Sequence, residues 1–136
     1  MEKQLTVLLA DDNKMFRQSV QVLLATFGAV RICWEACNGE EAIALAAEHS
    51  PDIVLLDINM SPVNGFEATR KILRQNPAIK IIGFSMHTGA SYCQNLMRLG
   101  ARGYLSKDSS PAEIRMAITE VASGGKYISK NIQGNL

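Results

Sequence analysis

The stretch Pro51-Asp52-Ile53-Val54-Leu55-Leu56-Asp57 decides the fold. Four consecutive apolar residues, 53–56, follow a Pro-Asp turn and end in an acidic residue. A short, continuous apolar run between turn residues is typical of a central parallel strand that is covered on both faces. Parallel neighbours need crossover connections, which are usually helices, so the stretch predicts an α/β domain.

Short apolar runs alternate with amphipathic stretches on both sides of this strand. Further strands are expected at residues 5–10, 31–37, 79–84 and 103–106, and helices at residues 16–27, 39–47, 65–75, 92–99 and 111–121. This strict alternation predicts a doubly wound, five-stranded parallel sheet with helices on both faces.

Local signals support these helix boundaries. Asn38 followed by Glu41, and Ser110-Pro111 followed by Glu113, both have the pattern of a helix start with a capping side chain. Gly100 and Gly124-Gly125 are placed to end the helices that precede them.

Composition bounds the functions that are open to the chain. Its 136 residues predict one domain, and the hydrophobic fraction of 47% is ordinary for a globular protein. A formal net charge of +1 gives no overall attraction to nucleic acid or to a membrane surface. No apolar run reaches the roughly 20 residues of a membrane span. Three cysteines without a secretion signal favour the reducing cytoplasm.

Reactive side chains follow four of the five expected strands. Asp11-Asp12 follows the first strand, Asp57 the third, Ser85 the fourth and Lys107 the fifth. Functional residues of such sheets gather at the carboxyl ends of the strands, near the point where strand order reverses. We therefore expect these side chains to converge on one site.

The chemistry of this set points to phosphoryl transfer. Clustered carboxylates repel one another, and a divalent cation with hard oxygen ligands, such as Mg²⁺, relieves that repulsion. A carboxylate can also act as a nucleophile toward phosphorus. The Lys107 ammonium and the Ser85 hydroxyl are suited to bind the oxygens of a phosphoryl group on Asp57.

The chain resembles the receiver domain of two-component response regulators over essentially its whole length. The matching residues are Asp11-Asp12, Asp57-Ile58-Asn59-Met60, Asn64-Gly65, Ser85, Gly100-Ala101, Gly103-Tyr104 and Lys107. Residues 100–108 and 123–129 are similar to the LuxR/NarL/FixJ-type subfamily, which carries a C-terminal helix-turn-helix DNA-binding domain. The resemblance implies a flavodoxin-like fold with strand order 2-1-3-4-5.

The resemblance also implies a role for each acidic position. Asp57 would be the phosphoacceptor and a ligand of Mg²⁺. Asp12 would bind the ion directly, Asp11 would bind it through water, and the Asn59 backbone carbonyl would be a further ligand.

Other positions would respond to the phosphoryl group. Ser85 would be the switch hydroxyl, Lys107 the phosphate-binding lysine, and Tyr104 the aromatic residue that turns inward when the hydroxyl moves. Asn59 and His87 would border the phosphoryl group and tune its lifetime.

The resemblance further implies partners and a domain layout. A sensor histidine kinase would donate the phosphoryl group, the phosphorylated form would be a candidate homodimer, and DNA would be bound only by a C-terminal domain outside this chain. Residues 1–126 are expected to form the receiver and residues 127–136 to begin a linker. Apart from self-phosphorylation and autodephosphorylation, which depend on Mg²⁺, no enzymatic activity is expected.

One departure from the family pattern lies in Met60-Ser61-Pro62, since the family commonly has proline directly after this methionine. The loop keeps its length, so the fold is expected to survive, while the backbone path at Asn59 is left open.

Alternatives remain beside this hypothesis. One of Asp11, Asp12 and Asn13 could simply cap the first helix. A haloacid-dehalogenase-type hydrolase would need Asp-x-Asp, but Asn59 stands where the second acid is needed. A flavin- or nucleotide-binding module would need a glycine-rich first loop instead of an acidic one, and a docking module without phosphorylation stays open. Cys33 and Cys37 are expected to be buried thiols, not metal ligands.

Overall fold

The computed structural model describes residues 4–136, so the first three residues of the predicted domain lie outside it. Its strands are β1 (Leu5–Ala10), β2 (Val30–Ala36), β3 (Ile53–Asp57), β4 (Lys80–Ser85), β5 (Gly103–Ser106) and β6 (Tyr127–Ile128). Its helices are α1 (Lys14–Leu24), α2 (Gly39–His49), α3 (Gly65–Gln75), α4 (Ala90–Arg98), α5 (Pro111–Ala122) and α6 (Lys130–Gln133). Each predicted strand is present, two of them with the predicted bounds.

The strands form one parallel sheet in the order β2-β1-β3-β4-β5-β6. The predicted order of the first five strands is confirmed, but the prediction of a five-stranded sheet is wrong because β6 adds a sixth strand beside β5. β6 has only two residues and follows Gly124-Gly125, so it has no apolar run that could reveal it in the sequence.

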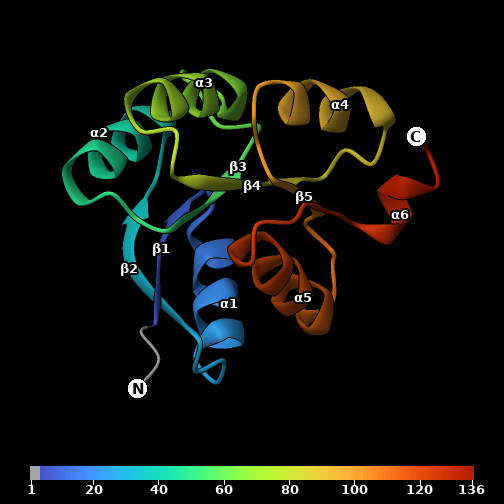
Figure 1. Cartoon of the computed structure of the whole chain (residues 1–136), viewed down its shortest axis with the longest axis horizontal. Helices are drawn as coiled ribbons and strands as arrows, with labels where there is room; N and C mark the ends of the chain where they lie inside the picture. Colours follow the sequence, from blue (N-terminus) through green and yellow to red (C-terminus); the bar gives the residue numbers. More distant parts are fainter. Residues whose placement is uncertain (1–3) are drawn as a thin grey trace.

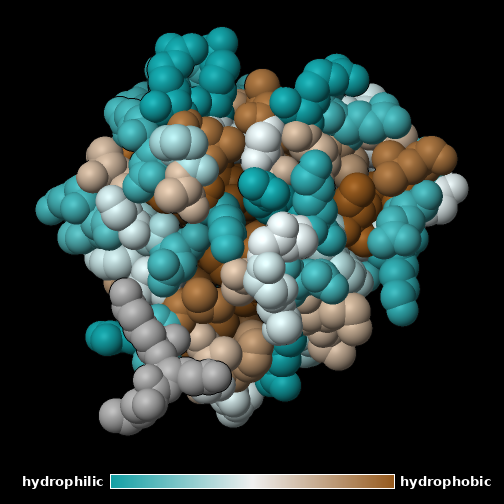
Figure 2. Space-filling view, in the orientation of Figure 1, coloured by the Kyte–Doolittle hydropathy of each residue, from teal (hydrophilic) through white to brown (hydrophobic). Residues whose placement is uncertain are grey.

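Helices cover both faces of the sheet (Figure 1). One core joins the sheet to α2, α3, α4 and α6, and the other joins it to α1 and α5. All five residues of β3 are buried, as expected for the central strand between two helix layers. The face in Figure 2 carries hydrophilic residues around its rim and hydrophobic residues in the middle and near the C-terminal end.

Side-chain caps begin the helices where the sequence predicts them. Asn38 Oδ1 accepts from the Glu41 N–H at 2.8 Å, and Ser110 Oγ accepts from the Glu113 N–H at 3.1 Å. The two glutamates do not return these bonds to the capping residues. Glu41 accepts from the Cys37 N–H instead, and Glu113 accepts from the Tyr127 hydroxyl and the Lys130 N–H. Glu113 thus ties α5 to the C-terminal segment.

The C-terminal segment, residues 127–136, packs against β5, α4 and the loop that follows β4. The buried Ser129 hydroxyl accepts from the Ser106 N–H at 3.0 Å, and the Ser129 N–H donates to the Tyr104 carbonyl at 2.9 Å. Ile132 is fully buried in the core beneath α4. Asn135 Nδ2 donates to the Thr88 carbonyl at 2.7 Å, in the loop that follows β4.

Within residues 4–136, none of the helices combines the length and the hydrophobicity that a membrane crossing requires.

Candidate functional site

The carboxyl ends of β1 and β3 bring three carboxylates together. Asp11 and Asp12 directly follow β1, and Asp57 is the last residue of β3. One carboxylate oxygen from each of these residues lies within 4.8 Å of the others. Asp11 and Asp57 are buried, whereas Asp12 is exposed. The predicted convergence of the acidic residues is therefore present in the structure.

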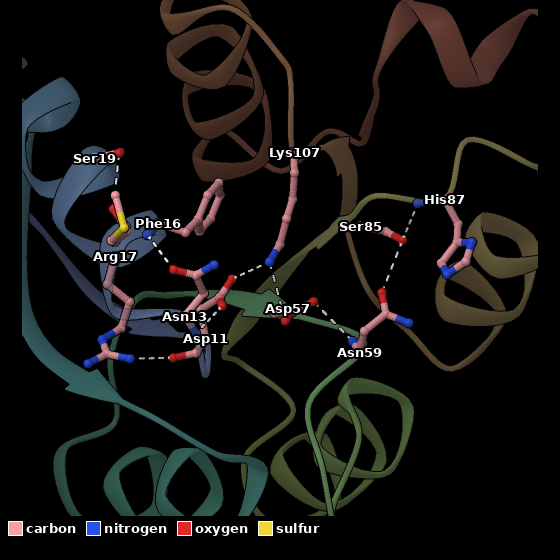
Figure 3. Close-up of polar contacts among 11 residues, drawn as sticks. Asp11, Asn13, Phe16, Arg17, Ser19, Asp57, Asn59, Ser85, His87 and Lys107 are labelled. Atoms are coloured by element: carbon pink, nitrogen blue, oxygen red, sulfur yellow. Dashed lines mark hydrogen bonds and ion pairs between the residues drawn. The ribbon is translucent and has the colours of Figure 1, made fainter.

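Lys107 reaches into this acidic cluster from the end of β5 (Figure 3). Its ammonium nitrogen lies 2.7 Å from Asp11 Oδ2 and 3.4 Å from Asp57 Oδ2. The same nitrogen lies 4.6 Å from the centre of the Phe16 ring on α1, which forms part of the wall beside it. The ammonium thus partly offsets two negative charges that are held away from water.

Burial dominates the electrostatics of Asp57. Loss of water raises the pKa of its carboxyl above the usual value, and the nearby Asp11 charge raises it further. The Asn59 N–H, which donates to Asp57 Oδ1 at 3.0 Å, and the Lys107 ammonium act in the opposite direction without reversing the shift. The ionised form of Asp57 therefore lacks part of the positive charge that it needs.

The donor set fits a hard divalent cation. Asp11 Oδ2 is buried, and its partner among residues 4–136 is the Lys107 ammonium at 2.7 Å. Three carboxylates with spare lone pairs and an exposed side toward Asp12 match the oxygen-rich, partly hydrated coordination that Mg²⁺ prefers. Asp11, Asp12 and Asp57 are the residues that would hold the ion.

A second polar group borders Asp57 on the β4 side. The buried Ser85 ends β4, and its hydroxyl accepts from the His87 N–H at 2.9 Å and lies 3.4 Å from Asn59 Oδ1. The His87 ring does not enter this network, because it stacks on Tyr92 with ring centres 4.5 Å apart. The structure thus places Ser85 and Asn59 beside Asp57, while His87 contributes through its backbone.

Tyr104 is fully buried in β5. Its hydroxyl donates to the His87 carbonyl at 3.2 Å, and burial raises the pKa of its phenol. Tyr104 therefore already lies inward in this structure, in the position that we expect it to take after switching.

The loop that differs from the family pattern at Met60-Ser61-Pro62 keeps its contact with the site. The Ser61-Pro62 peptide bond is cis, and the Gly65 N–H donates to the Ile58 carbonyl at 3.1 Å. A β-carbon at Gly65 would lie 2.4 Å from the Ile58 α-carbon, so only glycine fits where this helix begins. The Asn59 N–H still donates to Asp57 Oδ1, so this contact survives the change in the loop.

The residue that caps α1 is Asn13, since its Oδ1 accepts from the Phe16 N–H at 3.1 Å. Neither neighbouring aspartate is needed as the cap.

The prediction of buried thiols is wrong for Cys37, which is exposed just beyond the end of β2, and Cys33 is half-buried. Sequence reasoning assigned no role to Arg17, although its guanidinium contacts the Asp11 carbonyl.

The fold and this acidic site together define a class of protein, the signal-receiving domains of two-component systems. The chain belongs to the response regulator receiver domain family, and the match to this family covers residues 7–119.

Relatives and solved structures agree with this membership. The chain is 35% identical to the transcriptional regulatory protein DegU of Brevibacillus brevis over 99% of the chain and 57% of that relative. It is 38% identical to the response regulator UvrY of Escherichia coli K12 over 94% of the chain and 59% of that relative. The crystal structure of a LuxR-family two-component response regulator from Aurantimonas sp. SI85-9A1 matches with a TM-score of 0.94 and 32% identity, covering 98% of this chain and 95% of that one. The chain thus spans less than two thirds of the length of these curated relatives.

Proposed function

We propose that the chain is a phosphorylation switch that accepts a phosphoryl group on Asp57 from a phosphohistidine of a sensor kinase. The observation that carries this proposal is the position of Asp57, buried at the end of the central strand, with a lysine ammonium 3.4 Å away and two further carboxylates beside it. A buried carboxylate with this surrounding has the charge balance of a phosphoryl-accepting nucleophile.

In the proposed step, an oxygen of the Asp57 carboxylate attacks phosphorus and forms an O–P bond. The P–N bond of the phosphohistidine breaks, and its electron pair stays on the imidazole nitrogen, which takes up a proton. Lys107 stabilises negative charge on the transferred oxygens, and the Ser85 hydroxyl can hydrogen-bond one of them. Mg²⁺, when bound by Asp11, Asp12, Asp57 and the Asn59 carbonyl, would supply further neutralisation of phosphoryl charge.

The response would spread through the loop after β4. Moving the Ser85 hydroxyl toward the phosphoryl group requires its bond with the His87 N–H to change, and the His87 carbonyl is tied to Tyr104. Asn59 and the backbone at His87 border this path and would influence how long the phosphoryl group lasts. The result would be a shift between two surface arrangements around α4, β5 and α5.

One relative, DegU, is named a transcriptional regulatory protein, and the others are named response regulators, which supports an output in transcription. By analogy with them, we propose that DNA is bound by a C-terminal domain beyond this chain, that phosphorylation promotes a homodimer, and that the protein works in the cytoplasm. Residues 1–126 would form the receiver, and residues 127–136 would lead toward the output domain.

The test is intact-mass spectrometry after incubation with acetyl phosphate, with and without Mg²⁺, on the wild-type chain and on Asp57→Asn. The expected result is one added phosphoryl group, seen only with Mg²⁺ and only in the wild-type chain. An equal adduct on Asp57→Asn would reject the site. If no adduct forms, binding of beryllofluoride with Mg²⁺ distinguishes rapid dephosphorylation, which permits binding, from a docking module, which does not bind.

A further inference from the structure

Arg17, in the first turn of α1, connects the Asp11-Asp12 loop to the neighbouring strand β2. Its Nη1 donates to the Asp11 backbone carbonyl at 2.6 Å, and its Nε donates to Glu35 Oε1 on β2 at 3.0 Å. The side chain of Arg17 is only 15% exposed, although it lies on a surface helix. In Figure 3 the guanidinium points toward Asp11, on the opposite side of that residue from Lys107.

These contacts fix the peptide that links the two adjacent acidic residues. The Asp11 N–H donates to the Ala36 carbonyl at 3.0 Å, and its carbonyl is held by Arg17. Because a peptide group is planar, a fixed Asp11 carbonyl also fixes the direction of the Asp12 N–H and the position of its α-carbon.

Asp12 depends on this support more than its neighbours do. Its side chain is exposed and makes no hydrogen bond or ion pair with residues 4–136, whereas Asp11 contacts Lys107 and Asp57 contacts both Lys107 and the Asn59 N–H. The backbone is therefore what sets the starting point of the Asp12 carboxylate.

We infer that Arg17 is a positioning residue for the cation site: it orients the Asp11-Asp12 peptide so that the Asp12 carboxylate can bind the same cation as Asp57. This inference rests on the proposed Mg²⁺-dependent function. The guanidinium is not a ligand and touches no reacting atom. Its effect passes through one backbone carbonyl.

Electrostatics and positioning predict opposite results when Arg17 is replaced. Removing a positive charge next to an acidic cluster should, by charge alone, strengthen the binding of a divalent cation. Removing the support of a ligand should weaken it, and losing such an outer partner typically lowers metal affinity about 10- to 100-fold. The sign of the change in Mg²⁺ affinity thus distinguishes the two effects.

The experiment measures Mg²⁺ affinity from the amide shifts of the wild-type chain and of Arg17→Met at fixed pH and ionic strength. Arg70→Met is the matched control, because Arg70 is also a helix arginine paired with a glutamate, but it lies on α3 and its partner is Glu67. Arg17→Met is expected to weaken Mg²⁺ binding about tenfold, and Arg17→Lys, which keeps the charge and an N–H donor for the Asp11 carbonyl, should restore part of the loss. Glu35→Gln, which leaves the Asp11 carbonyl bond in place, should stay close to the wild type.

Phosphorylation kinetics supply a second readout. At saturating Mg²⁺, Arg17→Met should react with acetyl phosphate at nearly the wild-type rate, while the Mg²⁺ concentration for half-maximal rate rises about tenfold. Unchanged or tighter Mg²⁺ binding in Arg17→Met, or an equal loss in Arg70→Met, would overturn the inference. If thermal unfolding shows that Arg17→Met is not folded, Arg17→Gln decides, since it also removes the positive charge, and unchanged or tighter Mg²⁺ binding in that variant would overturn the inference. A wild-type chain that binds no Mg²⁺ would instead reject the proposed function.

Discussion

The ammonium of Lys107 lies where it partly neutralises Asp11 and Asp57. A divalent cation at the same carboxylates would have to share them with this positive charge. We therefore predict that Lys107→Ala binds Mg²⁺ more tightly, by about threefold to tenfold, which corresponds to about 1 kcal/mol of relieved repulsion, the water-screened end of the range for charges about 4 Å apart.

The same variant should lose most of its reaction with acetyl phosphate, because no other ammonium of residues 4–136 lies within ion-pair distance of Asp57. Titration with Mg²⁺ and the rate of phosphorylation measure the two effects separately. Weaker Mg²⁺ binding in Lys107→Ala would contradict the idea that lysine and cation share these carboxylates.

Which residues meet at the site could be predicted from the sequence, because strand order and strand ends determine it. Asp57, Ser85 and Lys107 each end or directly follow a recognisable apolar run. Arg17 could not be identified in this way, since its partner is a backbone carbonyl and a backbone carbonyl has no signature in the sequence. We expected Tyr104 to turn inward only on switching, and its inward position in this structure could not be predicted, because it depends on the path of the loop that carries His87.

At the level of secondary-structure elements, Ser129 holds β6 and α6 against the sheet. Its hydroxyl is the acceptor for the buried Ser106 N–H and lies 3.0 Å from the Ser109 hydroxyl. Ser129→Ala leaves this N–H without a partner, which typically costs about 1–3 kcal/mol.

Amide hydrogen exchange in residues 127–136 should therefore become about 10- to 100-fold faster in Ser129→Ala if the segment opens locally. Ser123→Ala, at the exposed C-terminal end of α5, is the control and should leave these amides unchanged. An equal effect of both variants would show that Ser129 does not anchor the segment.

Glu113 makes the attachment of the same segment sensitive to pH. Burial raises the pKa of its carboxyl, but the Lys130 N–H and the Tyr127 hydroxyl outweigh burial, so the folded-state pKa is lower than usual. A carboxyl with a lowered pKa stabilises the fold above its unfolded-state pKa, near 4.3, and loses this contribution as the pH falls through the folded-state value.

We predict that the segment loosens in acid, below about pH 4.3. The pH dependence of the Lys130 amide shift measures this opening, and Glu113→Gln should abolish the dependence. The Tyr127 phenol, whose pKa burial and Glu113 raise to about 12, should ionise at lower pH in the same variant.

Elements with a strong hydrophobic period or a capping residue were predictable, and those defined by contacts were not. Asn38 and Ser110 mark helix starts because each side chain satisfies a backbone N–H in its own local sequence. β6 is held by backbone bonds to Arg102 and Tyr104, which are distant in the chain, so neither its length nor its composition reveals it.

For the molecule as a whole, the buried acidic site lowers the stability of the fold while it provides the functional carboxylates. Burying Asp57 beside another carboxylate disfavours the folded, metal-free protein at neutral pH, as the raised pKa of Asp57 indicates. Asp57→Asn should therefore raise the melting temperature without Mg²⁺ by roughly 2–6 °C, the shift that about 1 kcal/mol produces in a domain of this size.

Mg²⁺ should stabilise the wild-type chain more than Asp57→Asn, because the variant lacks one of the charged ligands. Thermal unfolding of both proteins, with and without Mg²⁺, measures both effects. A lower melting temperature of Asp57→Asn in the absence of Mg²⁺ would show that the Lys107 ion pair outweighs the burial of the carboxylate.

The two-residue strand β6 also shields the flank of the sheet. Without it, the backbone carbonyls of Arg102 and Tyr104, which now accept from the Tyr127 and Ser129 N–H groups, would be bare, and the apolar surface beneath Ile132 would be uncovered. Bare strands of this kind recruit the same strand of another molecule and lead to aggregation. A shortened chain that ends at Lys126 should therefore precipitate at concentrations where the 136-residue chain stays monodisperse, so a short C-terminal segment protects the whole domain from self-association.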